Sequence, residues 1–369
     1  MKNRMRQQSP KRQARKAEML VIGVDLGDRT SRYCVLDGNG EIQVEGSVGT
    51  TKKAMAAKFG GLARCRMAVE VGTHSPWVSR LLNSLGHEVI VANARQVQLI
   101  SASSRKDDRM DAETLGRLAR VDPELLRPVR HRSEDAQMAL MAIRVRAGLV
   151  EARTKLVNIA RGLSKSVGER LPGCSTSQMG MDKLVEVPEP LQEALRPLME
   201  QVESLTAKIE DQNRKIEEIG REQYPETELL QQITGVGTLI ALTFLLTVEC
   251  KERFEKSRDV GCYVGLRPKR GESGQRQPEL SITKEGDRYL RKLLVQGAHY
   301  ILSRFGPDTD LKRWGMKLAA RGGKNAKKRA VVAVARKLAV LLHRLWVTGE
   351  VYEPLRNSQA TQSRNSTAA

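Results

Sequence analysis

Four acidic residues stand where a folded chain can gather carboxylates for phosphate chemistry. Asp25 ends the apolar run MLVIGVDL and Glu70 ends the run RCRMAVE, so both are expected where a buried strand stops. Asp108 and Asp111 lie three residues apart at the start of a predicted helix and therefore share one face of it. Such a set can hold two divalent ions that polarise a phosphate, with Mg²⁺ favoured by hard oxygen ligands and Mn²⁺ as an alternative.

These acids also have plainer interpretations. A strand-end Asp is common in turns, and acids in a first helical turn suit the helix dipole. RNase H-like nucleases use an Asp followed by Gly at a strand end to hold metal, and actin-like kinases use the same device to hold ATP phosphates. The kinase fold needs a second phosphate loop and a second actin-like half, and neither is found in this sequence.

Ser273 is a candidate nucleophile in the basic loop RPKRGESGQRQ, with Arg270 and Arg276 close to it in the sequence. A hydroxyl has a high pKa and attacks readily only when cations or a metal help to remove its proton. Ser-Gly in a loop is also ordinary turn chemistry, so this spacing alone does not decide between the two interpretations.

The charge balance indicates a polyanionic partner. The 369 residues include 63 Lys and Arg against 43 Asp and Glu, a formal net charge of +20. Nucleic acid is the first choice, ahead of an anionic membrane surface or a ribosome-like assembly. Residues 311–349 hold eleven Lys or Arg and no acid, and are expected to follow a nucleic-acid backbone. Aromatic residues are only 4%, which disfavours base stacking as the mode of reading.

Other functional classes are disfavoured. No apolar run is long enough for a transmembrane helix, and the basic N-terminus lacks the apolar segment of a signal peptide. Five scattered cysteines without a CxxC pair indicate a reducing cytoplasm, without a disulfide framework or a zinc site.

The elements that would position these residues predict an α/β part followed by an all-α part. Residues 1–18 are expected to be a basic disordered arm. Residues 19–132 predict three antiparallel strands and then alternating helices and strands, a mixed sheet flanked by helices. Residues 133–224 predict long helices, residues 225–350 a mainly helical C-terminal domain with the serine loop, and residues 351–369 a disordered tail.

A heptad pattern lies within residues 133–224. Its spacing predicts a coiled coil or an antiparallel helical hairpin, with an ordinary bundle helix as the alternative. The seam positions are Leu191, Leu195, Leu198, Val202, Leu205, Ile209, Ile216 and Ile219. Farther on, the Gly-Val-Gly of ITGVGTL predicts a turn between helices that can offer backbone N–H groups to a phosphate.

The motifs taken together resemble the DEDD transposases of the IS110 insertion-sequence family, over residues 20–348. The N-terminal half carries GVDLG, AVEVGTHSPWVSRLLNSLGHEVIVANARQV and KDDRMDAETLGRLA, which contain the four acids. The C-terminal half carries ITGVGTLIALTFLLTV, YVGLRPKRGESGQ and ITKEGDRYLRKLLVQGA. The family form has Thr before the first Asp of the third motif, where this chain has Asp107, and often a doubled Ser in the serine loop, where this chain has only Ser273.

The resemblance implies a fold and a mechanism. Residues 19–132 would form a RuvC-like domain of RNase H fold, with two Mg²⁺ held by the four acids in each composite site. A coiled coil would separate this domain from a C-terminal transposase domain. Ser273 would attack DNA and form a 5′-phosphoserine link during strand exchange.

The resemblance also implies partners. Donor and target DNA duplexes would be specified by a noncoding bridge RNA, and the chain would act as a dimer that pairs into a tetramer. It would work in the prokaryotic cytoplasm, associated with the nucleoid. The residues expected to contact nucleic acid are Arg105, Lys106, Arg109, Arg267, Lys269, Arg270, Arg276, Lys284, Arg288, Arg291, Lys324, Lys327, Lys328 and Arg329.

Two other functions stay open at this point. The first is a RuvC-type, Mg²⁺-dependent endonuclease that resolves branched DNA without a covalent intermediate, for which Ser273 would be dispensable. The second is a non-catalytic nucleic-acid-binding protein.

Overall fold

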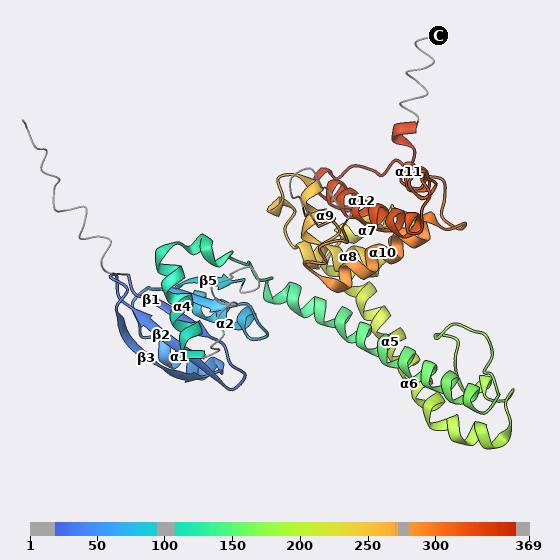
Figure 1. Cartoon of the computed structure of the whole chain (residues 1–369), viewed down its shortest axis with the longest axis horizontal. Helices are drawn as coiled ribbons and strands as arrows, with labels where there is room; N and C mark the ends of the chain where they lie inside the picture. Colours follow the sequence, from blue (N-terminus) through green and yellow to red (C-terminus); the bar gives the residue numbers. More distant parts are fainter. Residues whose placement is uncertain (1–18, 94–107, 270, 272–279, 359–369) are drawn as a thin grey trace, which may run out of the picture. The chain divides into compact units, whose positions relative to one another are not determined.

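The computed structural model describes residues 19–93, 108–269, 271 and 280–358 (Figure 1). The chain divides into two compact units, Met1–Arg132 and Ser133–Ala369. The first is mixed α/β and the second is mainly helical, which confirms the expected class at that level. Within the described residues no helix is long and apolar enough to span a bilayer. All five cysteines are free thiols.

A five-stranded mixed sheet forms the centre of the first unit, in the order β3-β2-β1-β4-β5. The neighbours β1–β2 and β2–β3 are antiparallel, whereas β1–β4 and β4–β5 are parallel. The apolar runs that end at Asp25 and Glu70 form the neighbouring inner strands β1 and β4, and helices cover both faces of these strands. The strands are β1 (Val21–Asp25), β2 (Thr30–Leu36), β3 (Ile42–Gly49), β4 (Arg66–Glu70) and β5 (Glu88–Ala92).

Helices cover the two faces of this sheet (Figure 1). On one face, α1 (Lys52–Phe59) and α2 (Ser75–Ser84) pack on alternate residues of β1, β4 and β5, including Ile22 and Met67. On the other face, α4 (Asp108–Val121) packs on the intervening residues. The short 3-10 helix η4 (Pro123–Leu126) follows α4, and Asn93 beyond β5 donates its backbone N–H to the carbonyl of Leu126.

The contact between α4 and β1 is unusually close because it is made by two glycines. A Cβ atom at Gly23 would collide with the carbonyl oxygen of Ala112 and the backbone nitrogen of Gly116. A Cβ atom at Gly116 would lie 3.2 Å from the backbone nitrogen of Gly23 and 3.2 Å from Leu36 Cδ1. This backbone-on-backbone packing fixes the start of α4 against the central strand.

Two long helices open the second unit, α5 (Glu134–Ser166) and α6 (Glu189–Gln223). Ser133 caps α5, as its sequence predicts, by accepting a hydrogen bond from the N–H of Ala136. The helices run antiparallel, because Arg153 donates to Thr206 Oγ1 at 3.2 Å while Arg146, one heptad earlier, donates to Asn213, one heptad later. The 3-10 helix η5 (Met181–Lys183) lies in their connection.

The predicted heptad seam lies on the face of α6 that turns inward. Leu195, Val202, Ile209 and Ile216, each seven residues from the next, are buried. The other seam positions, Leu191, Leu198, Leu205 and Ile219, are half-buried. The structure thus shows a helical hairpin within one chain, and a coiled coil in the strict sense stays a prediction.

The rest of the second unit packs around one apolar helix, α8 (Thr238–Val248), which is buried along most of its length. Its core includes residues of α10 and α12, such as Leu294 and Leu338. The other elements are α7 (Glu226–Gln231), η6 (Lys251–Arg253), η7 (Ser257–Asp259), α9 (Val260–Tyr263), α10 (Arg288–Leu302), α11 (Asp310–Ala319) and α12 (Ala326–Thr348).

Candidate active site

Two of the predicted carboxylates lie side by side at one edge of the sheet. Asp25 is the last residue of β1 and Glu70 is the last residue of β4. The two strands are parallel neighbours and Val24 pairs with Val69, so the next residue of each strand emerges at the same edge. Both side chains are half-buried. The strand register therefore brings together two acids that are far apart in the sequence.

The third carboxylate, Asp111, comes from α4. Its neighbour Ala112 is buried against β1 at Gly23, so the close helix–strand contact also determines where Asp111 lies. Burial raises the pKa of Glu70, and the negative charge of Asp111 raises it further. The carboxylates of Glu70 and Asp111 therefore repel each other at this edge, and a bound cation would relieve that repulsion.

The fourth carboxylate, Asp108, belongs to the first turn of α4, but its side chain and that of Arg109 lie outside the described part of the structure. Arg105 and Lys106 fall in the segment 94–107, which is also outside it. Among the described side chains, no group of three or more His, Cys, Asp or Glu is close enough to hold a metal ion. The donor set is nevertheless all carboxylate oxygen, the chemistry that hard divalent cations prefer.

The same edge carries a histidine whose sequence context does not distinguish it from an ordinary surface or core residue. His74 follows β4 and lies with its Nε2 3.6 Å from Asp28 Oδ1, in the loop after β1. The indole N–H of Trp77 donates to His74 Nδ1 at 3.1 Å. This bond leaves Nε2 as the protonated nitrogen of the neutral ring, facing Asp28. The loops after β1 and β4 are thereby tied together beside Asp25 and Glu70.

Other titratable residues near these motifs have structural contacts. Asp37 accepts hydrogen bonds from the backbone N–H groups of Glu41 and Asn39, which hold its pKa below the usual value although burial opposes them. Glu113 pairs with Arg117 one turn along α4. His87 is buried and hydrogen-bonds the carbonyl of Phe59.

The structure describes the stem of the loop that contains Ser273, in which the two sides of the loop are hydrogen-bonded to each other. Backbone N–H groups of Lys269 and Thr283 donate to the carbonyls of Ser281 and Arg267, each at 2.9 Å, which joins the two sides of the stem. Arg291 on α10 supports its base by donating to the carbonyls of Val264 and Glu285. Ser273 itself, with Arg270 and Arg276, lies outside the described residues.

The sequence of the chain matches models of known protein families. A model of DEDD transposases of the IS110 type matches residues 22–166, and a model described as "Transposase IS116/IS110/IS902 family" matches residues 227–313. Together the two matches span more than half of the chain and include Asp25, Glu70, Asp111 and Ser273. The chain belongs to the IS110 family of transposases.

Curated relatives extend the similarity beyond the matched domains. The transposase for insertion sequence element IS1111A of Coxiella burnetii is 26% identical over 93% of each chain. The probable family 20 transposase of Pseudomonas aeruginosa is 29% identical over 90% of this chain and 98% of its own. The transposase for insertion sequence element IS1328 of Yersinia enterocolitica is 27% identical over 77% of this chain and 84% of its own.

Membership in this family fixes the broad activity. Transposases cut and rejoin DNA, so this IS110-family member is an enzyme that acts on DNA. A DEDD domain further implies dependence on divalent metal, in keeping with the carboxylates at the sheet edge. The predicted resemblance is thus confirmed at the level of family, enzyme class and DNA as a partner.

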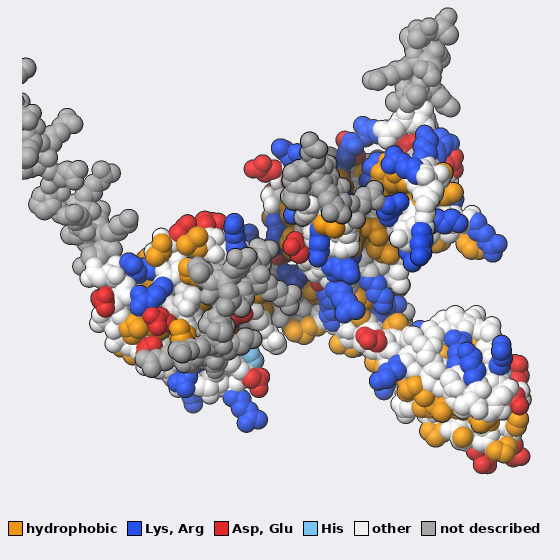
Figure 2. Space-filling model, in the orientation of Figure 1, with side chains coloured by type: hydrophobic (Ala, Val, Ile, Leu, Met, Phe, Trp, Pro, Cys, Tyr) orange, Lys and Arg blue, Asp and Glu red, His pale blue; other side chains and the backbone are white. Residues whose placement is uncertain are grey.

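Figure 2 shows many Lys and Arg side chains on the surface of this transposase. Most of the predicted nucleic-acid contacts that the structure describes are exposed residues of the second unit. Arg291 is the exception, because it is half-buried and bonded to the stem of the serine loop. The exposed members are Arg267, Lys269, Lys284, Arg288, Lys324, Lys327, Lys328 and Arg329.

The Gly-Val-Gly turn of the transposase connects α7 to α8 as predicted. Gly235 has a φ of +95°, and a Cβ there would lie 3.0 Å from the ring of Tyr300, so glycine suits both its backbone and its surroundings. Gly237 precedes the first turn of α8. A phosphate contact at this turn stays a prediction.

Proposed function

We propose that this transposase is an RNA-guided DNA recombinase whose first unit is a RuvC-like domain of RNase H fold. The sheet order supports this fold, because an antiparallel run β3-β2-β1 is followed by β4 and β5 parallel to β1. The observation that carries the proposal is the convergence of Asp25 and Glu70 at one sheet edge, with the charge of Asp111 acting on Glu70.

The proposed metal site consists of Asp25, Glu70, Asp108 and Asp111. Two Mg²⁺ ions bound there would polarise the scissile phosphate and stabilise the charge that develops on it. The chain itself supplies the placement, because β1, β4 and the glycine-packed α4 are held together by backbone contacts. His74, tied to Trp77 and facing Asp28, would lie beside the DNA at the same edge.

In the proposed chemistry, Ser273 Oγ attacks the scissile phosphate and forms a new phosphorus–oxygen bond. The bond from phosphorus to the 3′ oxygen breaks, and that oxygen leaves as a hydroxyl once it has taken up a proton. The serine proton passes to a neighbouring base or to water. Rejoining is the reverse, in which the 3′ hydroxyl of another strand attacks the 5′-phosphoserine and releases the serine.

The proposed partners are a noncoding bridge RNA, donor and target duplexes, and further copies of the chain in a dimer or tetramer. The net charge of +20 supports binding to several nucleic-acid strands. The exposed cations of the second unit would follow phosphate backbones, and base pairing with the RNA would supply the sequence specificity.

A covalent-trapping experiment tests the proposal. The full chain is incubated with Mg²⁺, RNA transcribed from the flanking DNA of its element, and end-labelled donor and target duplexes. Because the serine would keep the fragment that carries the strand's 3′ end, a label on that end should give a labelled protein band on denaturing gels that disappears with EDTA and in Ser273→Ala. Ser281→Ala is the matched control, because Ser281 is an exposed serine of the same loop's stem whose described contacts are made by its backbone.

Two outcomes would overturn the proposal. Cleavage without an adduct, unaffected by Ser273→Ala, would indicate a metal-dependent endonuclease of the junction-resolving kind. Binding without any cleavage in the presence of the RNA would indicate a non-catalytic nucleic-acid-binding protein.

A further inference from the structure

A groove of about 730 Å³ lies between α11, α12 and the chain that follows α12. The segment that closes it, Glu350–Ser358, is called the strap below. The floor of the groove contains Trp314 from α11 and Leu341 from α12, and its rim carries charged side chains from both helices. Its lining includes Arg313, Lys317, Lys337 and Arg344, which belong to the basic stretch 311–349 that is expected to follow a nucleic-acid backbone.

The two helices supply four basic side chains and one acid, Asp310, to the groove. Arg313 and Lys317 lie one turn apart on α11, and Lys337 and Arg344 lie two turns apart on α12; all four side chains are exposed. Lys337 Nζ lies 4.0 Å from the centre of the Trp314 ring. Lys317 makes no ion pair with any described residue, so its charge is available to a ligand.

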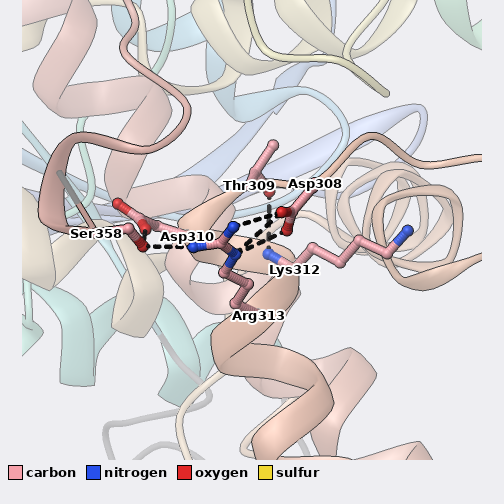
Figure 3. Close-up of polar contacts among 6 residues, drawn as sticks. All are labelled: Asp308, Thr309, Asp310, Lys312, Arg313 and Ser358. Carbon is pink, nitrogen blue, oxygen red and sulfur yellow. Dashed lines mark hydrogen bonds and ion pairs between the residues drawn. The ribbon is translucent and has the colours of Figure 1, made fainter. Parts of the chain in front are cut away.

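The strap is held down at its middle and at its end. Tyr352 is half-buried, and its backbone N–H donates to Gln232 Oε1 at 2.8 Å. The hydroxyl of Ser358 donates to Asp310, and Arg313 donates to the same hydroxyl while its guanidinium also pairs with Asp308 (Figure 3). The strap is therefore part of the folded unit rather than a loose tail.

At the other end of the strap, the carboxylate of Glu350 forms ion pairs with two arginines of the groove. Its Oε2 lies 3.3 Å from Arg344 and 3.1 Å from Arg356. Glu350 is 42% exposed, Arg344 50% and Arg356 52%, so water screens both ion pairs. Pairs of this kind contribute little to stability and exchange readily for another anion.

We propose that the groove between α11 and α12 binds the phosphate backbone of a nucleic-acid strand, and that Glu350 competes with a phosphate for Arg344 and Arg356. Lys317 and Lys337 contact phosphates from the two sides of the groove, and Trp314 offers an apolar surface to the sugar or base. When the strand binds, the Glu350 carboxylate leaves the two arginines while Tyr352 keeps the strap anchored. The inference deepens the proposed function by naming a surface that takes the nucleic acid.

The distribution of charge favours a strand over a small anion. The cations are spread along two helices and the strap rather than gathered around one point, and the floor between them is apolar. A phosphodiester backbone presents repeated charges with apolar sugar between them, which matches such a groove. DNA and RNA share this chemistry, and the test therefore includes both.

The first part of the test removes the ammonium groups of Lys317 and Lys337. Binding of the full chain to fluorescein-labelled single-stranded RNA, single-stranded DNA and duplex DNA is measured by anisotropy at several salt concentrations. The double variant Lys317→Ala/Lys337→Ala should bind at least one of the three about tenfold more weakly, with a salt slope smaller by about 1.5. The matched control Lys208→Ala/Lys215→Ala removes two exposed lysines from α6 and should bind within about twofold of the unchanged chain.

The second part removes the competing carboxylate. Glu350→Gln keeps the size of the side chain but frees Arg344 and Arg356, so binding of the same probe should become about two- to fivefold tighter.

The third part uses Trp314, whose fluorescence should be quenched by the bound strand. The quenching seen with the unchanged chain should be reduced in Trp314→Phe.

Equal affinity of Lys317→Ala/Lys337→Ala and Lys208→Ala/Lys215→Ala for all three probes would overturn the assignment of the groove. Unchanged or weaker binding by Glu350→Gln would overturn the competition. Neither result would bear on the catalytic proposal, because DNA cleavage and the serine adduct are not part of these measurements.

Discussion

The carboxylate edge of the first unit and the basic groove of the second are built in opposite ways. Asp25, Glu70 and Asp111 are placed by strand register and by a backbone contact at Gly23 that leaves no room for a side chain. The groove carries exposed charged side chains from α11, α12 and the strap, and its ion pairs are open to water. The edge thus has few charged groups on rigid backbone, and the groove has many charged groups on long, exposed side chains.

This difference teaches what each region can do. Phosphate chemistry needs donors held in place before the substrate arrives, because small displacements cost large factors in rate. Backbone binding needs only charge spread along a surface, and the loss of one contact is tolerated. We therefore expect changes in the edge to have large effects and single changes in the groove to have small ones.

The largest effect on stability should come from the contact that fixes α4. In Gly23→Ala the new methyl group meets the backbone of Ala112 and Gly116, so the unfolding free energy of the first unit should fall by about 3 kcal/mol. Urea denaturation followed by far-UV circular dichroism measures this change. Gly61→Ala is the control, since a Cβ there meets nothing within 4 Å. Equal stability of the two variants would mean that the close packing does not fix the edge.

A smaller effect is expected at the base of the serine loop. Arg291→Ala removes the guanidinium that donates to the carbonyls of Val264 and Glu285, and should destabilise the second unit by about 2 kcal/mol. The same variant should lower strand exchange more than DNA binding. Arg288→Ala removes an exposed neighbouring charge on α10. If the two variants behaved alike in denaturation and in strand exchange, Arg291 would be a nucleic-acid contact rather than a support of the loop.

A pH-dependent loss of stability is expected from His343. Burial lowers its pKa, opposed by its bond to the carbonyl of Lys251 and by the charge of Glu252, so the folded state binds the proton less well than the unfolded chain. Stability should therefore fall as the pH drops through the unfolded value near 6.5 toward the lower folded value. Urea denaturation at pH 7.5 and pH 5.5 measures the free energy of unfolding at each pH. The difference between the two values should be smaller in His343→Gln than in the unchanged chain. A steeper dependence in the variant would contradict the assignment.

The smallest effect should come from one groove lysine. Lys337→Ala removes one exposed charge and its contact with Trp314, so stability should change by less than about 0.5 kcal/mol and nucleic-acid affinity by about twofold. Thermal denaturation and anisotropy measure the two quantities. A loss of binding as large as that of Lys317→Ala/Lys337→Ala would mean that the groove acts through one fixed contact, as the edge does.

Much of the fold could be predicted from the sequence, because strand and helix periods are local signals. The apolar runs that end at Asp25 and Glu70 gave the central strands, and the spacing of Leu195, Val202 and Ile209 gave the buried seam of α6. The mixed α/β class and the helical second half are confirmed. The roles of Asp108 and Ser273 stay predictions, because these side chains lie outside the described residues.

The features that escaped prediction depend on contacts between distant residues. Nothing in the local sequence distinguishes Gly23 and Gly116 from ordinary glycines, although their contact positions α4. The pairing of His74 with Asp28 joins two loops that only the strand order brings together. Residues 351–358 were expected in a disordered tail, whereas Tyr352 and Ser358 pack against the groove. The sequence does not predict this packing because a single aromatic anchor has no periodic pattern.

The most direct test of the account measures cleavage and binding on the same samples. Asp25→Asn should abolish DNA cleavage and leave nucleic-acid affinity within twofold of the unchanged chain, whereas Lys317→Ala/Lys337→Ala should weaken binding and still cleave at saturating protein concentration. Glu41→Gln removes an exposed acid beyond the end of β2, at the opposite end of the sheet from Asp25, and should retain cleavage. Cleavage by Asp25→Asn at the normal rate, or a loss of binding that matches its loss of cleavage, would contradict the separation of the catalytic edge from the binding surface.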